Sequence, residues 1–262
     1  MSLDRATVEQ LAEHLENAEL ERREVVKITD SHPDMSWDDA YDIQEAIRAR
    51  KAGRGGKVAG LKMGLTSKAK MNQMGVDDPI YGFLTDYGAV RDGGEIEVSG
   101  LIHPKIEAEI AFVLKAPLRG GGCTVEQVLA ATDFVMPALE VIDSRYLDFK
   151  FDLKSVIADN TSAARFVVGG APRSPVGLDL PNLGLVMMKN GSIAATAAGS
   201  EVLGDPALSV AMLADMLAKR GRELPAGTLI LTGGATIAVP VEAGDNITLR
   251  VQNLGDVSVR FV

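Results

Sequence analysis

The sequence predicts an α+β protein with a β-rich core and a helical N-terminal region. Three observations predict this fold class. Apolar residues recur at helical spacing in the first 50 residues, short runs with strand character follow, and the last 35 residues again have the short alternating runs of strands. No linker divides the chain convincingly, so we expect a single catalytic domain over residues 1–262, with residues 1–52 as a helical region packed on it.

Two helices are expected at the N-terminus. Thr7 and Gln10 form a capping-box pattern at the start of an apolar stripe, which predicts a helix over residues 7–24. Ser36 is placed to cap the second helix. The expected buried face of that helix consists of Ala40, Ile43, Ala46 and Ile47.

A short strand is expected over residues 58–63, after a glycine-rich turn. Glycines flank Leu61 and Lys62, so another group can approach the backbone closely there. The Gly-x-x-x-x-Gly-Lys-Ser/Thr pattern of a phosphate-binding loop is absent. From the residues alone, we interpret Lys62 as a lysine whose long side chain extends from an apolar strand to solvent.

The remaining elements are inferred from caps, turns and runs of apolar residues. In the middle of the chain we expect a short helix from Ser67 to Gly75, a turn over residues 77–82, strands near 95–99 and 106–110, a capped helix from Thr124 to about Thr132, a buried strand over 134–143, and a polar loop over 157–164. Towards the C-terminus we expect an Asn190-Gly191 hairpin, a helix from Asp205 to Gly221, strands over 228–232, 235–239, 246–252 and 257–262, and Gly-Asp turns at 244–245 and 255–256.

Composition excludes several classes of protein. The net charge of −9 argues against nucleic acid as a partner. The sequence contains no run of 18 apolar residues, so we expect no transmembrane helix. The N-terminus lacks the apolar core of a signal peptide. Cys123 is the only cysteine, so no intramolecular disulfide forms, and we interpret it as a loop residue. These features lead us to expect a cytoplasmic protein.

One segment alternates strictly between apolar residues and acids. Ile106, Ala108 and Ile110 would face one side of a strand, and Glu107 and Glu109 the other. Two interpretations are open: a solvated polar face of an edge strand, or two carboxylates held near a core and offset by a divalent cation. Carboxylate oxygens suit Mg²⁺ or Mn²⁺.

A third acid favours the metal interpretation. Glu140 lies between Leu139 and Val141 in a run that is otherwise apolar. A buried carboxylate is costly unless it is paired or binds a metal. Nothing in the residues alone shows that Glu140 lies near the other two acids.

With these segments identified, the chain resembles the 4-oxalocrotonate decarboxylase and 2-hydroxypentadienoate hydratase group of meta-cleavage pathways. That group has the fold of the fumarylacetoacetate hydrolase C-terminal domain, a β-rich mixed sheet or barrel core. The resemblance covers nearly the whole chain. The matching motifs are Gly60-Leu61-Lys62-Met63-Gly64-Leu65-Thr66-Ser67, Glu107-Ala108-Glu109, Leu139-Glu140-Val141-Ile142-Asp143, Ile157-Ala158-Asp159-Asn160 and Leu231-Thr232-Gly233-Gly234.

The resemblance implies a role for each of several residues. It implies that Lys62 is catalytic and faces the substrate beside the metal. The implied ligands of Mg²⁺ or Mn²⁺ are Glu107, Glu109 and Glu140, and the expected substrate-binding residues are Leu61, Ile80, Asn160 and Thr161. A small dicarboxylate is the expected substrate. No organic cofactor is expected, because an α-keto group can itself accept the electrons released by loss of CO₂.

One position separates the two activities of the group. The hydratases carry an acid just before an aromatic-glycine pair, which here is Tyr81-Gly82, and this chain has Ile80 at that place. Isoleucine cannot transfer protons, so we expect decarboxylation of 2-oxohex-3-enedioate. The hydratase remains the alternative, because Asp78 lies only two residues earlier and could reach the pocket from an extended segment.

Two further alternatives come from other activities. An acylpyruvate hydrolase would need a base, and His103 is a weak candidate because it precedes a proline at the start of a strand. A non-catalytic subunit would not need Lys62 and three acids. The resemblance also implies a homo-oligomer and a complex with the hydratase that uses the unstable dienol product.

Overall fold

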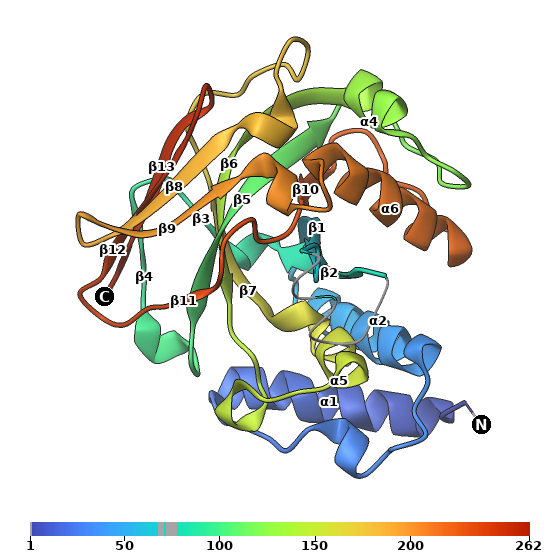
Figure 1. Ribbon diagram of the computed structural model, residues 1–262. Coiled ribbons are helices and arrows are strands. Elements are labelled where there is room, and N and C mark those ends of the chain that lie inside the picture. Colours follow the sequence, from blue (N-terminus) through green and yellow to red (C-terminus); the bar gives the residue numbers. More distant parts are fainter. Residues whose placement is uncertain (1, 68–70, 72–77) are drawn as a thin grey trace.

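The computed structural model describes residues 2–67, 71 and 78–262, and its centre is formed by two β-sheets (Figure 1). The strands of the larger sheet are β1 (Val58–Gly64), β2 (Ile80–Thr85), β3 (Ala89–Val90), β5 (Lys105–Leu114), β6 (Thr132–Ile142), β7 (Ala163–Val168), β10 (Leu229–Leu231) and β11 (Val239–Pro240). Their order is β2-β1-β10-β5-β6-β7-β3, and β11 also pairs with β5. The pairs β1–β10 and β3–β7 are parallel and the other pairs are antiparallel.

The smaller sheet packs against β6 and β7 of the larger one. It contains β4 (Gly94–Ile96), β8 (Gly184–Lys189), β9 (Ser192–Ala198), β12 (Asn246–Val251) and β13 (Gly255–Phe261). These strands are arranged in the order β4-β13-β12-β8-β9. The mixed α+β architecture expected from the sequence is therefore confirmed.

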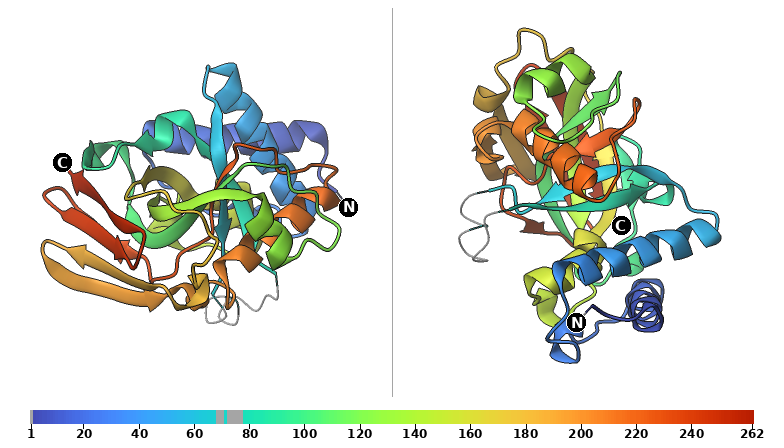
Figure 2. Two further views of the ribbon diagram at one scale, coloured as in Figure 1. Left: turned by 90° about the horizontal axis from the view of Figure 1, so that it is seen from above. Right: turned by 90° about the vertical axis from the view of Figure 1, so that its right-hand side faces the viewer.

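The helices form two groups around the sheets (Figures 1 and 2). They are α1 (Arg5–Glu21), α2 (Trp37–Gly53), α4 (Val125–Ala131), α5 (Leu153–Ala158) and α6 (Pro206–Lys219). α1, α2 and α5 pack together at one end of the larger sheet, and α4 packs on α6. Within the part of the chain described, no helix is long and apolar enough to cross a membrane.

A contiguous buried apolar cluster joins the helices to both sheets. It includes Leu15 of α1, Ile43 of α2, Phe112 of β5 and Phe261 of β13. Gln44 adds a polar connection, because its side-chain amide donates hydrogen bonds to the carbonyls of Tyr81 (3.0 Å) and Ile157 (2.9 Å). These bonds attach α2 to the backbone of β2 and to that of α5.

Several elements form as the sequence predicts. Ser36 caps α2 and Thr124 caps α4, each in a reciprocal capping box. Asp205 caps α6, with a proline at its first position. Asn190 and Gly191 both have left-handed backbone angles in the turn between β8 and β9, as a two-residue hairpin requires.

Other boundaries predicted from the sequence are wrong. α1 begins two residues early, because Asp4 and not Thr7 is the cap: the Asp4 carboxylate accepts a hydrogen bond from the Thr7 amide at 2.8 Å. Residues 80–82 are not a turn but the start of β2, where they pair with β1. The predicted helix from residue 67 to 75 falls largely outside the described residues. The polar loop is shorter than predicted, since residues 157–158 end α5 and residues 163–164 begin β7.

Two corrections concern the C-terminal strands. A strand was predicted over residues 235–239, but the strand in the structure is β11, which has two residues, 239 and 240. Both of them pair with β5. Gly255 and Asp256 belong to β13, and the turn before them contains Asn253 with φ of 65°. Asparagine tolerates left-handed backbone angles better than most residues, which explains why the turn lies before the glycine.

The buried carboxylate of Asp39 links the chain start to the cap of α2. It accepts hydrogen bonds from the Ser2 hydroxyl (2.7 Å), the Leu3 amide (2.9 Å), and the amide (2.9 Å) and hydroxyl (2.7 Å) of Ser36. Burial by itself would raise the pKa of Asp39, but these bonds outweigh it and lower the pKa from 3.8 to about 2.

Replacing Asp39 with asparagine is expected to remove a pH-dependent part of the stability. Because the folded pKa is depressed, the stabilisation is present above the unfolded pKa and is lost as the pH falls through about 2. The shift corresponds to about 2 kcal/mol of unfolding free energy. Urea unfolding between pH 7 and pH 2 measures it, with Asp34→Asn as an exposed control. Parallel pH curves for the parent and Asp39→Asn would contradict the prediction.

Candidate metal centre and active site

The pairing of β5 with β6 brings the three predicted acids together. Glu107 lies directly opposite Glu140, and Glu109 is two residues further along the same face of β5. All three are buried, with exposures of 6% for Glu107 and 0% for Glu109 and Glu140. One carboxylate oxygen from each lies within 4.8 Å of the others. β5 lies between β10 and β6, so the interpretation as the solvated face of an edge strand is wrong.

This cluster has the properties of a divalent cation site. Glu109 Oε1 and Glu140 Oε1 are buried without a hydrogen-bond partner. Such oxygens are costly unless a cation or donor satisfies them. Three carboxylate oxygens that lie within 4.8 Å of one another could bind one divalent ion such as Mg²⁺ or Mn²⁺.

Burial also makes the negative charges of this cluster unfavourable without a cation. Desolvation, followed by the charge of Glu140, raises the pKa of Glu109 well above its usual range. Desolvation likewise raises the pKa of Glu140, although the nearby Lys62 ammonium opposes that shift. A divalent cation would reverse both effects, because it favours the charged form of every carboxylate that binds it.

Two consecutive glycines after β10 make room for the acids. The Gly233 amide donates a hydrogen bond to Glu109 Oε2 at 2.7 Å. Its φ of +101° lies in the left-handed region, where a side chain is strained. A Cβ on Gly234 would lie 2.7 Å from the carboxyl carbon of Glu107, so only glycine leaves space for this acid.

Lys62 on β1 provides the positive charge of the site. Its Nζ lies 3.1 Å from Glu140 Oε2 and donates a hydrogen bond to the Thr161 carbonyl at 3.1 Å. The side chain is only 2% exposed, so the interpretation of Lys62 as a lysine that reaches solvent is wrong. A preorganised ammonium in a water-poor site can stabilise negative charge that develops on a substrate.

The turn that receives Lys62 has an unusual backbone. Asn160, Thr161 and Ser162 have φ values of 50°, 55° and 56°. Left-handed angles cost roughly 1–2 kcal/mol for each residue other than glycine, so the surrounding contacts must hold the turn in place. Gly82 allows the close approach, because a Cβ there would lie 2.8 Å from the Asn160 carbonyl oxygen.

The side-chain amide of Asn160 makes contacts within the protein. Its side-chain oxygen accepts a hydrogen bond from the Phe83 amide, and its side-chain nitrogen donates one to the Phe83 carbonyl, both at 2.9 Å. The amide is therefore used to attach the turn to β2. The Thr161 hydroxyl donates to the Tyr81 carbonyl at 2.9 Å, but Thr161 also lines the cavity beside Lys62.

A cavity of about 510 Å³ opens beside the acids. Four of the predicted site residues line it, namely Lys62, Ile80, Glu107 and Thr161. Leu61 does not, since neighbouring residues on a strand point to opposite faces and Leu61 lines a different cavity beside residues 221–228. Asp78 is exposed and lines a third cavity with Trp37 and Tyr41.

The other side of this cavity was not predicted from the sequence. Lys105, Phe149 and Phe151 line it, and Lys105 Nζ lies 3.9 Å from the centre of the Phe149 ring. The strand alternation could have identified Lys105, which shares a face with Glu107 and Glu109. No local signal identifies Phe149, because the loop after β6 brings it there.

This fold and this buried acid cluster define a class of metal-dependent enzyme, and comparison with known proteins gives its family. The family model described as fumarylacetoacetate (FAA) hydrolase C-terminal matches residues 59–262, and the chain belongs to that family. The chain is 61% identical over 261 residues to a 4-oxalocrotonate decarboxylase of Pseudomonas sp. (strain CF600), covering 100% of this chain and 99% of that protein.

A solved structure and a more distant relative complete the comparison. The 4-oxalocrotonate decarboxylase from Pseudomonas putida G7, complexed with magnesium and adipate, has a TM-score of 0.97 and 59% identity, covering 99% of each chain. A 2-hydroxyhexa-2,4-dienoate hydratase of Comamonas testosteroni is 40% identical, covering 98% of each chain. These two decarboxylases are therefore considerably more similar to this chain than that hydratase is.

Proposed function

We propose that this chain is a carboxy-lyase that uses Mg²⁺ or Mn²⁺ to convert 2-oxohex-3-enedioate (4-oxalocrotonate) to 2-hydroxypenta-2,4-dienoate and CO₂ in the meta-cleavage breakdown of aromatic compounds. One structural observation carries the choice of reaction: the cavity beside Lys62 has isoleucine at position 80, where a hydratase would place an acid. The identity of 61% to a 4-oxalocrotonate decarboxylase supports it. A relative's complex with magnesium and adipate supports both the cofactor and a dicarboxylate substrate.

The three acids and Lys62 have separate roles in this reaction. Glu107, Glu109 and Glu140 hold the cation, which when bound supplies a Lewis acid at the keto-acid end of the substrate. As the C5–C6 bond breaks, CO₂ leaves and its electron pair moves through the C3–C4 double bond to the C2 oxygen. The Lys62 ammonium, 3.1 Å from Glu140, is positioned to stabilise that developing charge.

Ile80 makes the cavity wall apolar at a position where hydration needs proton transfer. Its side chain is 1% exposed and lies beside Gly64 of β1. Among the described residues that line the cavity, Glu107 is the only acid and no histidine is present. An apolar wall favours neutral CO₂ over a charged carboxylate, whereas hydration needs an acid or base that can act on water.

His103 does not supply a base for an acylpyruvate hydrolase. Its Nε2 lies 2.7 Å from the Ser144 carbonyl, and its Nδ1 lies 3.1 Å from a Glu24 carboxylate oxygen. It lies outside the residues that line the cavity, and its contacts join the start of β5 to the loop after β6. We therefore assign His103 a structural role.

Replacing Ile80 with aspartate is expected to impair decarboxylation more than replacement with asparagine, which has the same shape without the charge. A carboxylate there repels the substrate carboxylate that must be lost. Ultraviolet assays of 2-oxohex-3-enedioate and 2-hydroxypenta-2,4-dienoate, with and without Mg²⁺ and with product identification, measure both activities. If the parent hydrates the dienoate and leaves the dicarboxylate unchanged, the assignment is wrong and the hydratase alternative holds.

The expected partners remain part of this proposal. We propose that the chain forms a homo-oligomer, binds the hydratase that consumes its unstable dienol product, and works in the cytoplasm. Chemical lability of the product supports the second point, because direct transfer would shorten its time in solution. Light scattering at micromolar concentration and co-purification with the hydratase test the first two points, and a monomer with no bound hydratase would refute them.

A further inference from the structure

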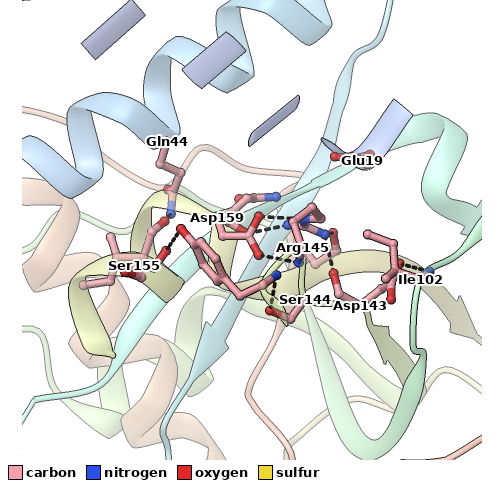
Figure 3. Close-up of polar contacts among 12 residues, drawn as sticks. Glu19, Gln44, Ile102, Asp143, Ser144, Arg145, Ser155 and Asp159 are labelled. Carbon is pink, nitrogen blue, oxygen red and sulfur yellow. Dashed lines mark hydrogen bonds and ion pairs between the residues drawn. The ribbon is translucent and has the colours of Figure 1, made fainter. Parts of the chain in front are cut away.

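Arg145, three residues beyond the end of β6, is the centre of a buried hydrogen-bond network (Figure 3). Its side chain is 2% exposed. The Arg145 Nε donates to Asp159 Oδ1, and its backbone amide donates to Asp159 Oδ2 at 3.1 Å. Burial raises the pKa of Asp159 to about 6, against the opposing effect of Arg145, so the pair is ionic at neutral pH.

The same guanidinium connects both ends of the left-handed turn at 160–162. One terminal nitrogen donates to the carbonyl of Asp159, immediately before the turn. The other donates to the carbonyls of Asp143 and, at 3.4 Å, of Ala163, immediately after the turn. The Asp143 amide also donates to the Ser162 carbonyl at 2.8 Å. Arg145 therefore holds the two ends of the turn together through the planar set of guanidinium donors, which lysine lacks.

On its other side, this turn holds Lys62. The Thr161 carbonyl accepts the hydrogen bond from Lys62 Nζ at 3.1 Å, and Lys62 lies at the same distance from Glu140. Arg145 is not among the residues that line the cavity beside the acids. Arg145 therefore does not face the cavity itself, and the turn is the segment that joins its guanidinium to Lys62.

We propose that Arg145, together with Asp159, is a positioning residue that sets the Lys62 ammonium relative to the acid cluster through the Thr161 carbonyl. The inference rests on the proposed function only in assigning Lys62 to decarboxylation. Without these guanidinium donors, the three residues of the turn would relax towards ordinary backbone angles, and the Thr161 carbonyl would move away from Lys62. A misplacement of about 1 Å can lower a rate by about 10²-fold.

The variants are Arg145→Met, Arg145→Lys and Asp159→Asn, and the matched control is Glu16→Gln. Glu16 is also fully buried and paired with two arginines, Arg50 and Arg54, but it lies in α1. The first readout is the rate at which Lys62 is reductively methylated in the magnesium-free protein, followed by peptide mass spectrometry. The second is kcat and KM for 2-oxohex-3-enedioate with Mg²⁺. Both are measured well below the unfolding temperature of every variant.

We expect Arg145→Met to raise the methylation rate of Lys62 several-fold and to lower kcat by about 10²-fold, with KM changed less than about threefold. Asp159→Asn keeps the size of the side chain and is expected to give a smaller change in the same direction, which preserves the test if Arg145→Met does not fold. Arg145→Lys should not restore kcat. Glu16→Gln should leave both readouts unchanged despite lost stability.

Parent-like labelling of Lys62 in folded Arg145→Lys and Asp159→Asn would overturn the inference, as would equal effects in Glu16→Gln. Labelling needs no substrate, so it decides the positioning role even if the parent fails to decarboxylate 2-oxohex-3-enedioate. That second failure would refute the proposed function instead.

Discussion

Lys62→Ala is expected to lower kcat for decarboxylation by about 10²–10³-fold, the effect of losing one preorganised charge-stabilising donor. Divalent cation binding should survive, because the three carboxylates that would bind the cation stay in place, and Lys62 is an ion-pair partner of Glu140 (3.1 Å) rather than a ligand. Removing the ammonium also removes a positive charge that competes with the cation for that carboxylate. Steady-state kinetics and calorimetric Mg²⁺ titration measure the two properties separately.

Two further variants separate charge from volume at this position. Lys62→Met fills most of the space without the charge, so its kcat should fall as far as that of Lys62→Ala, whereas its stability should fall less. Lys57→Ala removes an exposed lysine just before β1 and should behave like the parent. A Lys62→Met enzyme that keeps parent kcat would refute the electrostatic role.

Glu109→Gln is expected to abolish metal-dependent activity, with kcat/KM lowered by more than the roughly 10–100-fold typical of residues that only support metal ligands. Glu109 is fully buried, with one oxygen held by the Gly233 amide and the other without a hydrogen-bond partner. An amide retains the first contact and loses the charge that would bind the cation. Exhaustive chelation of the parent should give the same loss, reversed by Mg²⁺ or Mn²⁺.

The stability of Glu109→Gln should change in the opposite sense to its activity. Burial and the charge of Glu140 raise the pKa of Glu109 well above its usual range, so the charged carboxylate is unfavourable in the metal-free protein. Glutamine carries no charge, so the variant should be at least as stable as the parent in chelator. Mg²⁺ at 100 times its dissociation constant should stabilise only the parent, by about 2.7 kcal/mol.

Thermal unfolding with chelator and with Mg²⁺ measures this reversal. Glu95→Gln, which removes an exposed carboxylate on β4, serves as the control and should gain as much stability from Mg²⁺ as the parent. An equal gain in Glu109→Gln would show that the cation binds elsewhere.

Local patterns in the sequence identified most of the elements because the relevant physics is local. Capping boxes at Ser36 and Thr124 satisfy the amides of the next few residues, and the Asn190-Gly191 pair suits a tight turn. The missed strand β2 shows the limit. Its first residues follow Pro79 and resemble a turn, and only pairing with β1 makes them a strand.

Part of the site was also predictable, because some of its features depend only on neighbouring residues in the chain. Alternation along β5 places Glu107 and Glu109 on one face, and the apolar neighbours of Glu140 marked it as an unusual acid. Asn160, in a polar segment, was expected to bind substrate because of the family resemblance. Its amide instead binds the backbone of Phe83, about 80 residues earlier in the chain. A polar side chain does not show which backbone groups need a partner.

The sequence by itself therefore determined the α+β class, most of the capped helices, the shared face of two acids and, through its motifs, the family. The tertiary structure decided that Glu140 lies opposite Glu107, that Lys62 is buried against Glu140, and that Leu61 and Asp78 lie at other cavities. The reason is physical: alternation and capping depend on neighbours along the chain, whereas the charge balance of the site depends on strand register and on contacts between residues nearly 100 positions apart, such as Lys62 and Thr161.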